Sequence, residues 1–401
     1  MSMRYKGGTI PNPPTVTAPV GGEGGSASGS WTLQAQMQYA ALSQWPLPMK
    51  DKYLWSWGRN DSGQLGLGNT TNYSSPKQIG ALITWTSTTA GQLFTAAVKA
   101  DGTLWSWGSG QFGKLGLGNT TNYSSPKQVG ALTTWSKISA GSRHILAIQT
   151  DGTLWSWGYN ANGELGLGNT TNYSSPMQVG ALTTWLSVSA GKYSHSMAIK
   201  SNGTLWSWGQ NNYGQLGLGN TTNYSSPKQI GALTTWSSVA AGYSFTLAVQ
   251  TNGTLWSWGR NQYGQLGLGN TTNYSSPKQV GALTTWSSIT AGYYFITAIK
   301  TNGTLWSWGQ NNRGQLGLGN ATYYSSPIQV GALSTWSKIS SNFYQTLAIQ
   351  TNGTLWSWGY DNYGQLGLGN ITDYSSPTQV GALTTWLSVA CGAYSTLATK
   401  S

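Results

Sequence analysis

Leu54-Trp55-Ser56-Trp57-Gly58 is the stretch that decides the fold, because the chain contains it seven times. The first tryptophan of each later copy is Trp105, Trp155, Trp206, Trp256, Trp306 or Trp356, so every step is 50 residues except one of 51. A period near fifty is typical of propellers and solenoids, in which one unit cannot bury its own apolar face. The repeat therefore sets the architecture of this 401-residue chain.

Residues 227–264 show the strands that one unit predicts. Short runs rich in β-branched and aromatic residues cover 227–230, 236–240, 245–250 and 254–259. Asn252-Gly253 separates the last two runs and is a strong hairpin signal. Seven units of this kind predict an all-β fold, a seven-bladed β-propeller of four-stranded antiparallel blades.

The tryptophans and glycines of the repeat predict how the blades pack. The two tryptophans of each copy are two residues apart, so both point to one side of their strand, and we expect that side to pack against the next blade. The glycine after them and those of GQLGLGN are expected to allow positive φ or close approach. We also expect left-handed φ at Gly292, because Asn342 replaces it in the next copy.

The two ends of the repeat region are complementary. The last copy stops at Lys400-Ser401, where a hairpin turn is due, and the first begins at Lys52-Tyr53, just after such a turn. We therefore predict that residues 395–400 pair with residues 53–58. This pairing closes a propeller of residues 52–401 and leaves no free edge.

The N-terminal part of the chain has a different composition. Residues 1–30 are rich in Gly, Pro and Ser and predict an extended, flexible arm. Residues 31–45 predict a short helix, capped by Ser30 and stopped by Pro46, and residues 46–51 are a linker. The helix either packs on the propeller or docks the chain on a larger assembly, with Trp31, Leu33, Met37 and Trp45 as the docking residues.

The overall composition narrows the classes of protein. Charged residues make up only 7% of the chain, with a net charge of +12, and the lysines are spread around the repeats as a solvated rim rather than as a nucleic-acid stripe. The single cysteine, Cys391, excludes an internal disulfide and is expected to be a small buried residue. We expect a soluble chain without a membrane span or a secretory signal.

The residues of common catalytic and metal sites do not come together in the sequence. His144 and His195 lack carboxylates or thiols at ligand spacing and are interpreted as loop residues. The eight acidic residues are scattered, and GQLGLGN lacks the Lys-Ser/Thr of a phosphate loop. We expect a non-enzymatic protein with no catalytic residues, no cofactor and no metal.

The order of motifs in the unit resembles a known repeat. WSWGxNxxGQLGLGN is followed by SSPxQV, by WxSVxAG and by a strand that ends in Asp-Gly or Asn-Gly. This pattern over residues 52–401 resembles the regulator of chromosome condensation repeat family, which implies a seven-bladed propeller. Members of that family include a nucleotide exchange factor for a small GTPase and a secreted β-lactamase inhibitor. The resemblance therefore implies a binding platform rather than one activity.

The N-terminal segment carries a second resemblance. MRYKGGTI, GGEGGSASGSWTLQAQMQ and Trp45-Pro46 are similar to the leaders of marine bacteriophage virion proteins. This similarity implies a virion protein that contacts other virion proteins through residues 1–50, as part of an oligomeric assembly.

The copies differ from one another mainly in two segments, one after LWSWG and one after the Ala-Gly turn. Both segments lie at the same end of a strand hairpin, so we expect them to share one face of the disc, rich in Tyr, Phe, Asn and Gln, that suits binding. The candidate ligand residues are Arg59, Phe112, Arg143, His144, Tyr159, Tyr193, His195, Tyr213, Tyr243, Phe245, Tyr263, Tyr293, Tyr294, Phe295, Arg313, Phe343, Tyr344, Tyr360, Tyr363 and Tyr394.

These observations support two functional hypotheses. In the first, the chain is a phage tail-fibre or appendage module in the virion, and its variable face contacts a host-surface glycan or another virion protein. In the second, it is a protein-binding propeller, cytoplasmic or secreted, that regulates or inhibits a partner. Nucleic-acid binding and membrane insertion are not expected in either case.

Overall fold

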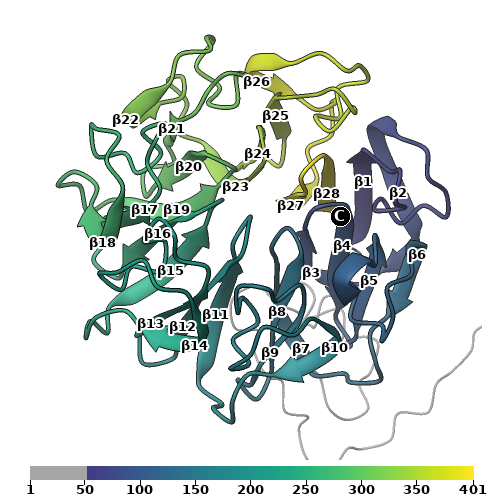
Figure 1. Cartoon of the computed structure of the whole chain (residues 1–401). Helices are drawn as coiled ribbons and strands as arrows, with labels where there is room; N and C mark the ends of the chain where they lie inside the picture. Colours follow the sequence, from purple (N-terminus) through teal and green to yellow (C-terminus); the bar gives the residue numbers. More distant parts are fainter. Residues whose placement is uncertain (1–51) are drawn as a thin grey trace, which may run out of the picture. The chain divides into compact units, whose positions relative to one another are not determined.

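Seven four-stranded antiparallel sheets form a closed ring within residues 52–401, the part of the chain that this computed structural model describes (Figure 1). The prediction of a seven-bladed propeller is therefore confirmed. The predicted arm, helix and linker, with Trp31, Leu33, Met37 and Trp45, lie outside the described residues. Among residues 52–401, the helical structure is one short 3-10 turn, η1 (Gln111–Gly113), and no helix is long and apolar enough to cross a membrane.

Six blades are each built from consecutive strands. Blade 1 contains β3 (Trp85–Ala90), β4 (Phe94–Lys99), β5 (Leu104–Gly108) and β6 (Tyr123–Gln128). Blade 2 contains β7 (Trp135–Ala140), β8 (His144–Gln149), β9 (Leu154–Gly158) and β10 (Tyr173–Gln178). Blade 3 contains β11 (Trp185–Ala190), β12 (His195–Lys200), β13 (Leu205–Gly209) and β14 (Tyr224–Gln229).

The second half of the ring repeats this plan. Blade 4 contains β15 (Trp236–Ala241), β16 (Phe245–Gln250), β17 (Leu255–Gly259) and β18 (Tyr274–Gln279). Blade 5 contains β19 (Trp286–Ala291), β20 (Phe295–Lys300), β21 (Leu305–Gly309) and β22 (Tyr324–Gln329). Blade 6 contains β23 (Trp336–Asn342), β24 (Gln345–Gln350), β25 (Leu355–Gly359) and β26 (Tyr374–Gln379).

The closing blade joins the two ends of the described chain. Its strand order is β2 (Tyr73–Ile83), β1 (Tyr53–Gly58), β28 (Ser395–Lys400) and β27 (Trp386–Cys391). The register of β1 and β28 runs from Tyr53 opposite Lys400 to Gly58 opposite Ser395, which confirms the predicted closure. Figure 1 shows the last strand lying beside the first one.

The outer strands correct the predicted boundaries of the unit. The sequence placed residues 227–230 at the start of a blade whose next strand is 236–240. In the structure β14 pairs with β13, so this run completes the preceding blade. A short polar strand carries little information about its partner, and here it lies half-exposed beside the tryptophan strand that comes before it in the chain.

The tryptophan pairs pack between blades, but on the side opposite to the one expected. Trp258 of blade 4 is fully buried and lies in one cluster with Met197 and Leu205 of blade 3. Its indole Nε1 donates a hydrogen bond of 2.9 Å to the carbonyl oxygen of Gln215, in the loop after β13. The second tryptophan of every LWSWG copy repeats this bond to the blade before it, not to the next one.

Glycine occupies two positions of the repeat for different reasons. Gly217 has φ +72°, and a Cβ there would lie 2.7 Å from Nε1 of Trp258, so both positive φ and close approach require glycine. Gly292 does not have positive φ, and the expectation of left-handed backbone there is wrong. A Cβ on Gly292 would instead meet the ring of Phe295, whereas Asn342 is followed three residues later by Gln345, which has no ring.

The lysines that precede the hairpin turn are not solvated as expected. Lys99, Lys200 and Lys300 are more than nine-tenths buried, and their Nζ atoms lie 3.8, 3.6 and 3.4 Å from the ring centres of Trp105, Trp206 and Trp306. Such cation–π stacking keeps the charge within the blade edge. Cys391 is buried in the core beside blade 6, as predicted.

Candidate functional site

The two variable segments of each repeat are hydrogen-bonded to each other. In blade 4, the backbone N–H of Arg260, which follows β17, donates to the carbonyl oxygen of Ser244, which precedes β16, at 2.9 Å. Equivalent bonds occur in every blade. The constant turns lie at the other end of the strands, where the N–H of Thr251 donates to the carbonyl of Thr235 at 2.8 Å. The predicted shared face is therefore real, and we call it the axial face.

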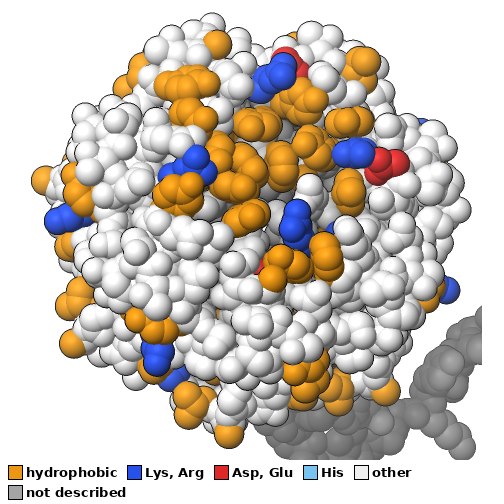
Figure 2. Space-filling model, viewed as in Figure 1, with side chains coloured by type: hydrophobic (Ala, Val, Ile, Leu, Met, Phe, Trp, Pro, Cys, Tyr) orange, Lys and Arg blue, Asp and Glu red, His pale blue; other side chains and the backbone are white. Residues whose placement is uncertain are grey.

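An arc of aromatic rings runs along this face across five blades. Tyr193, Tyr243, Tyr293, Phe343 and Tyr394 come from blades 3, 4, 5, 6 and the closing blade in turn. Neighbouring ring centres in this arc are 4.8, 4.0, 4.7 and 4.9 Å apart. Figure 2 shows hydrophobic side chains gathered at the centre of the disc, with positive side chains around them. The rings are half-buried against one another and keep one part exposed.

A second set of rings flanks the arc. Tyr294 lies 5.2 Å from Tyr243 and 5.0 Å from Tyr263, between ring centres, and Tyr363 lies 5.3 Å from Tyr394. Because the rings contact mainly other rings, they form a preorganised surface that loses little conformational entropy on binding.

Four arginines stand over these rings. The Cζ atom of Arg260 is 4.6 Å from the ring centre of Tyr213, and its Nη1 donates to the hydroxyl of Tyr294 at 3.0 Å. The other three stack in the same way: Arg59 over Tyr363 and Tyr394, Arg143 over Phe112 and Tyr159, and Arg313 over Tyr360. Each guanidinium keeps its charge at the edge of an aromatic surface.

Five tyrosine hydroxyls of this face are held in the neutral form. Burial raises the pKa of Tyr293 and Tyr294 well above the ordinary value, and the neighbouring Arg260 partly opposes this for Tyr294. Burial likewise raises the pKa of Tyr344, Tyr360 and Tyr394. The axial face therefore presents phenol hydroxyls that can both donate and accept hydrogen bonds.

Four predicted ligand residues do not reach the surface. His144, His195, Phe245 and Phe295 begin the second strand of their blades, and each is fully buried. This strand lies between two others and between two neighbouring blades, so all its side chains are enclosed. The prediction that these four contact a ligand, and that the histidines lie in loops, is wrong.

The buried histidines have a structural role. Nε2 of His144 lies 3.0 Å from Oγ of Ser196, and Nε2 of His195 lies 3.2 Å from Oγ1 of Thr246, each in the next blade. Burial lowers the pKa of His144 to about 3 and that of His195 to about 4. Both imidazoles are therefore neutral at neutral pH and link adjacent blades.

The remaining candidates divide by exposure. Arg313 is exposed, Tyr294 is 8% exposed, and the others are partly exposed. These partly exposed residues are Arg59, Phe112, Arg143, Tyr159, Tyr193, Tyr213, Tyr243, Tyr263, Tyr293, Phe343, Tyr344, Tyr360, Tyr363 and Tyr394. Sequence reasoning missed Arg260, although it occupies the position of Arg59 in its own repeat and the alignment of copies could have found it.

Two charged residues beneath the axial face were also missed. Lys114 and Glu164 replace the glutamine of GQLG and are almost fully buried. Lys114 donates from Nζ to the carbonyl of Gln92 at 3.0 Å, and burial lowers its pKa to about 8. Glu164 accepts the N–H of Asn162 at 2.8 Å, and burial raises its pKa to about 7.

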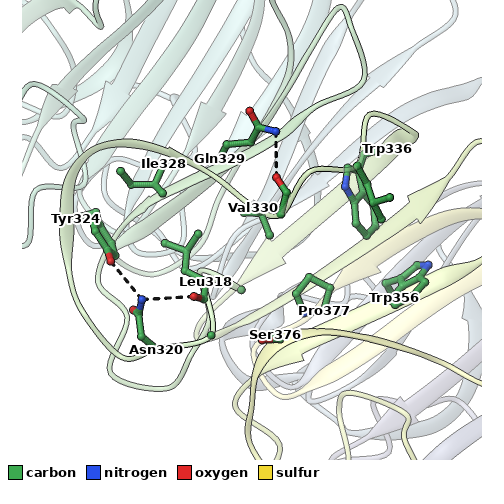
Figure 3. Close-up of a pocket in the computed structure, with 14 residues that line it drawn as sticks. Leu318, Asn320, Tyr324, Ile328, Gln329, Val330, Trp336, Trp356, Ser376 and Pro377 are labelled. Carbon is green, nitrogen blue, oxygen red and sulfur yellow. Dashed lines mark hydrogen bonds between the residues drawn. The ribbon is translucent and has the colours of Figure 1, made fainter.

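Grooves lie at the boundaries between blades in the described part of the chain. Between blades 5 and 6 the groove has a volume of about 580 Å³, with Leu318, Trp336, Trp356 and Pro377 in its wall (Figure 3). The amide of Asn320 is occupied by the hydroxyl of Tyr324 and by a backbone carbonyl. Similar grooves of 370–390 Å³ recur at other boundaries. Since most of their lining residues are constant between copies, the grooves follow from the repeat itself.

Comparison with known families agrees with the fold. The family described as "RCC1-like domain" matches residues 50–337, and the "Regulator of chromosome condensation (RCC1) repeat" matches residues 352–399. The chain belongs to the RCC1-like domain family. The resemblance of the repeat unit to this family is thus confirmed.

Two solved structures resemble this RCC1-like propeller closely in fold. Human WBSCR16 has a TM-score of 0.78 at 22% identity, with 88% of this chain and 99% of that one covered. Prp20p from Saccharomyces cerevisiae has a TM-score of 0.78 at 21% identity, with 88% and 92% covered. At these identities the likeness concerns the fold alone.

A curated relative matches a shorter part of the chain. The RCC2 homolog of Danio rerio is 48% identical over 48 residues, which is 12% of this chain and 10% of that protein. The chain thus matches about a tenth of the relative's length, roughly one repeat of the propeller.

Proposed function

We propose that this RCC1-like propeller is a non-enzymatic, protein-binding module, and that the axial face is its contact surface. The observation that carries the proposal is the arc from Tyr193 to Tyr394, together with the four arginines that stack on rings of the same face. Tyrosine and arginine are enriched at the energetic centres of protein interfaces. The arc also consists of residues that differ between copies, while the rest of each repeat is nearly constant.

Proteins similar to this chain are consistent with such a role. The structural study of Prp20p describes its binding properties to Gsp1p and histones, and yeast RCC1 (Prp20) has been crystallised with Kap60. Gsp1p, histones and Kap60 are partners of Prp20. For this chain we propose a folded protein partner with an exposed surface that accepts aromatic rings and arginine.

The virion role and a glycan ligand remain predictions. The virion role depends on residues 1–50, which lie outside the described residues. Whether the protein is localised in a virion or in the cytoplasm therefore also remains a prediction. The glycan ligand depends on the aromatic rings and amides of the axial face, which a glycan array can test directly.

Site-specific photo-crosslinking tests the proposal. A photoreactive phenylalanine analogue is placed at Tyr293 on the axial face, or at Leu233, which is 50% exposed on the opposite face. We expect the first variant to crosslink one defined protein from cells that carry the gene, and the second to crosslink none of it. The crosslink should disappear when Arg260→Ala is added.

Two results would contradict the proposal. One is equal crosslinking of the same protein from both faces, which would show non-specific contact. The other is saturable binding on a glycan array that the double variant Tyr293→Ala, Tyr344→Ala abolishes, without any protein crosslink. That outcome would favour a glycan ligand.

A further inference from the structure

The repeat of blade 6 has an acidic residue at a polar position that holds its long loop, which we call the clamp. In five of the seven repeats this position, two residues after the glycine of LWSWG, is an asparagine, and in blade 1 it is Gly110, which has no side chain to hold the loop. In blade 3 this is Asn211, whose Oδ1 accepts the N–H of Leu216 at 2.9 Å. Its Nδ2 donates to the main-chain oxygen of Asn220 at 2.9 Å and to the Oδ1 atom of Asn220 at 3.1 Å. The amide thus gives its protons to two oxygens of the loop.

The clamp in blade 6 has lost this donor. Asp361 replaces the asparagine. Asp373 replaces a second asparagine, which accepts the backbone N–H of the clamp residue in other repeats such as that of blade 3 and is Tyr323 in blade 5. Asp361 Oδ1 still accepts the N–H of Leu366 at 2.8 Å, and its own N–H donates to Asp373 Oδ1 at 2.8 Å. The local fold is therefore the same as in the other repeats.

The second oxygen of Asp361 is left without a partner. The residue is fully buried, and its Oδ2 makes no hydrogen bond. In blade 3 the amide nitrogen at this place donates to the oxygens of Asn220, the equivalent of Asn370. From the equivalence of the repeats we infer that Oδ2 of Asp361 faces Asn370. A buried acceptor that faces other acceptors is strongly unfavourable unless a proton or another positive group lies between them.

The nearby side chains supply this positive group only in part. Arg313, from the loop of blade 5, has its Nη1 atom 3.5 Å from Asp373 Oδ2. Asn370 directs its own amide nitrogen to the hydroxyl of Tyr374 at 3.0 Å, and its Oδ1 accepts the N–H of Thr372. Neither Arg313 nor Asn370 contacts Asp361 Oδ2. The clamp therefore contains two carboxylates and one guanidinium, and this oxygen has no positive partner.

We propose that the loop of blade 6 binds a hard cation, Ca²⁺ by preference, through the carboxylates of Asp361 and Asp373 and the oxygens of Asn370. Ca²⁺ takes six to eight oxygen ligands in flexible geometry, from carboxylates, carbonyls and water. Asn370 and the two residues after it are exposed, so solvent can reach the loop and complete the coordination. The cation replaces the amide group that holds the loop in five other repeats.

Calcium titration of the full chain tests this site. The chain is treated with EDTA, dialysed and titrated with CaCl₂ at pH 7.5, with binding followed by calorimetry and unfolding by the melting temperature. We expect one bound Ca²⁺ per chain and a rise in the melting temperature of roughly 2–4 °C at saturation. Mg²⁺, which demands stricter octahedral geometry, is expected to have a smaller effect.

The matched variants restore the residues of the other repeats. Asp361→Asn and Asp373→Asn rebuild the clamp of blade 3, so both are expected to fold, and the double variant should bind no Ca²⁺. No binding by the wild type, an equal response to Mg²⁺, or an undiminished response in the double variant would each overturn the proposal. A wild type that does not respond to Ca²⁺, with a pH dependence of stability that Asp361→Asn reduces, would also overturn it, since a proton would then occupy the clamp.

Discussion

Replacing His144 and His195 by phenylalanine should change how the stability of the propeller depends on pH. Burial lowers the pKa of both groups, to about 3 and about 4, from 6.5 in the unfolded chain. Because the folded pKa is depressed, the unfolded state takes up protons first as the pH falls below 6.5. The stability that the neutral imidazoles contribute above this pH is therefore lost on acidification.

The size of the effect follows from the number of groups. As the pH falls below 6.5, each histidine lowers the free energy of unfolding by roughly 1.4 kcal/mol per pH unit. The two histidines together therefore lower it by about 4 kcal/mol between pH 6.5 and pH 5. Glu164 and Asp361 act in the opposite sense. Burial raises the pKa of each to about 7, so their contribution is present at low pH and is lost as the pH rises through 7.

After EDTA treatment and without added Ca²⁺, the wild type is thus expected to have a similar stability at pH 7.5 and pH 5, because two acids and two imidazoles offset each other. Urea unfolding, followed by tryptophan fluorescence, measures this directly. The His144→Phe, His195→Phe variant should gain about 4–5 kcal/mol on going from pH 7.5 to pH 5, since two acids each contribute over nearly two pH units. Phenylalanine fits, since Phe94, Phe245 and Phe295 occupy the same place in other repeats.

The complementary variant provides the control. Glu164→Gln with Asp361→Asn leaves only the histidines to titrate, so its stability should fall by a similar amount over the same interval. If both double variants show the pH dependence of the wild type, these four groups do not govern it, and the reasoning is refuted.

Three further predictions concern the ring itself. Deleting residues 393–401 removes β28 from between β27 and β1, so the whole ring should unfold in one transition at lower temperature, whereas an unchanged melting temperature would contradict closure. Trp258→Ala should lower the free energy of unfolding by about 3–5 kcal/mol in urea, far more than Leu233→Ala on the surface. Gly217→Ala should cost more than Gly231→Ala in the same assay: both glycines have positive φ, but only the first has a tryptophan at 2.7 Å, and equal costs would argue against the close approach.

Much of the fold could be predicted because the repeat states it many times. The repeated LWSWG strand and the Asn-Gly turn predicted the blades. The predicted pairing of residues 395–400 with residues 53–58 closed the ring. The partner of an outer strand was harder to predict. Residues 224–229 alternate weakly and are half-exposed, so hydrophobic pattern alone does not say which neighbour they pair with.

The candidate site could be predicted as a face but not residue by residue. Variation between copies located the arc from Tyr193 to Tyr394, since loops that share a hairpin end must share a surface. It failed for His144 and Phe245, which are adjacent in sequence to exposed residues but begin strands buried on both sides. A one-residue difference in position decides between the two environments, and composition does not reveal it.

The pairing of Tyr53 with Lys400 means that the ring has no obligatory starting point. Ser401, followed by an added Asn-Gly and joined directly to Tyr53, would reproduce the turn Ser201-Asn202-Gly203 that connects the same two strands in blade 3. A chain joined there and opened at another exposed turn would have a new beginning and the same set of contacts. Circular permutants of this protein should therefore be viable scaffolds, with fusion points available at each blade around the disc.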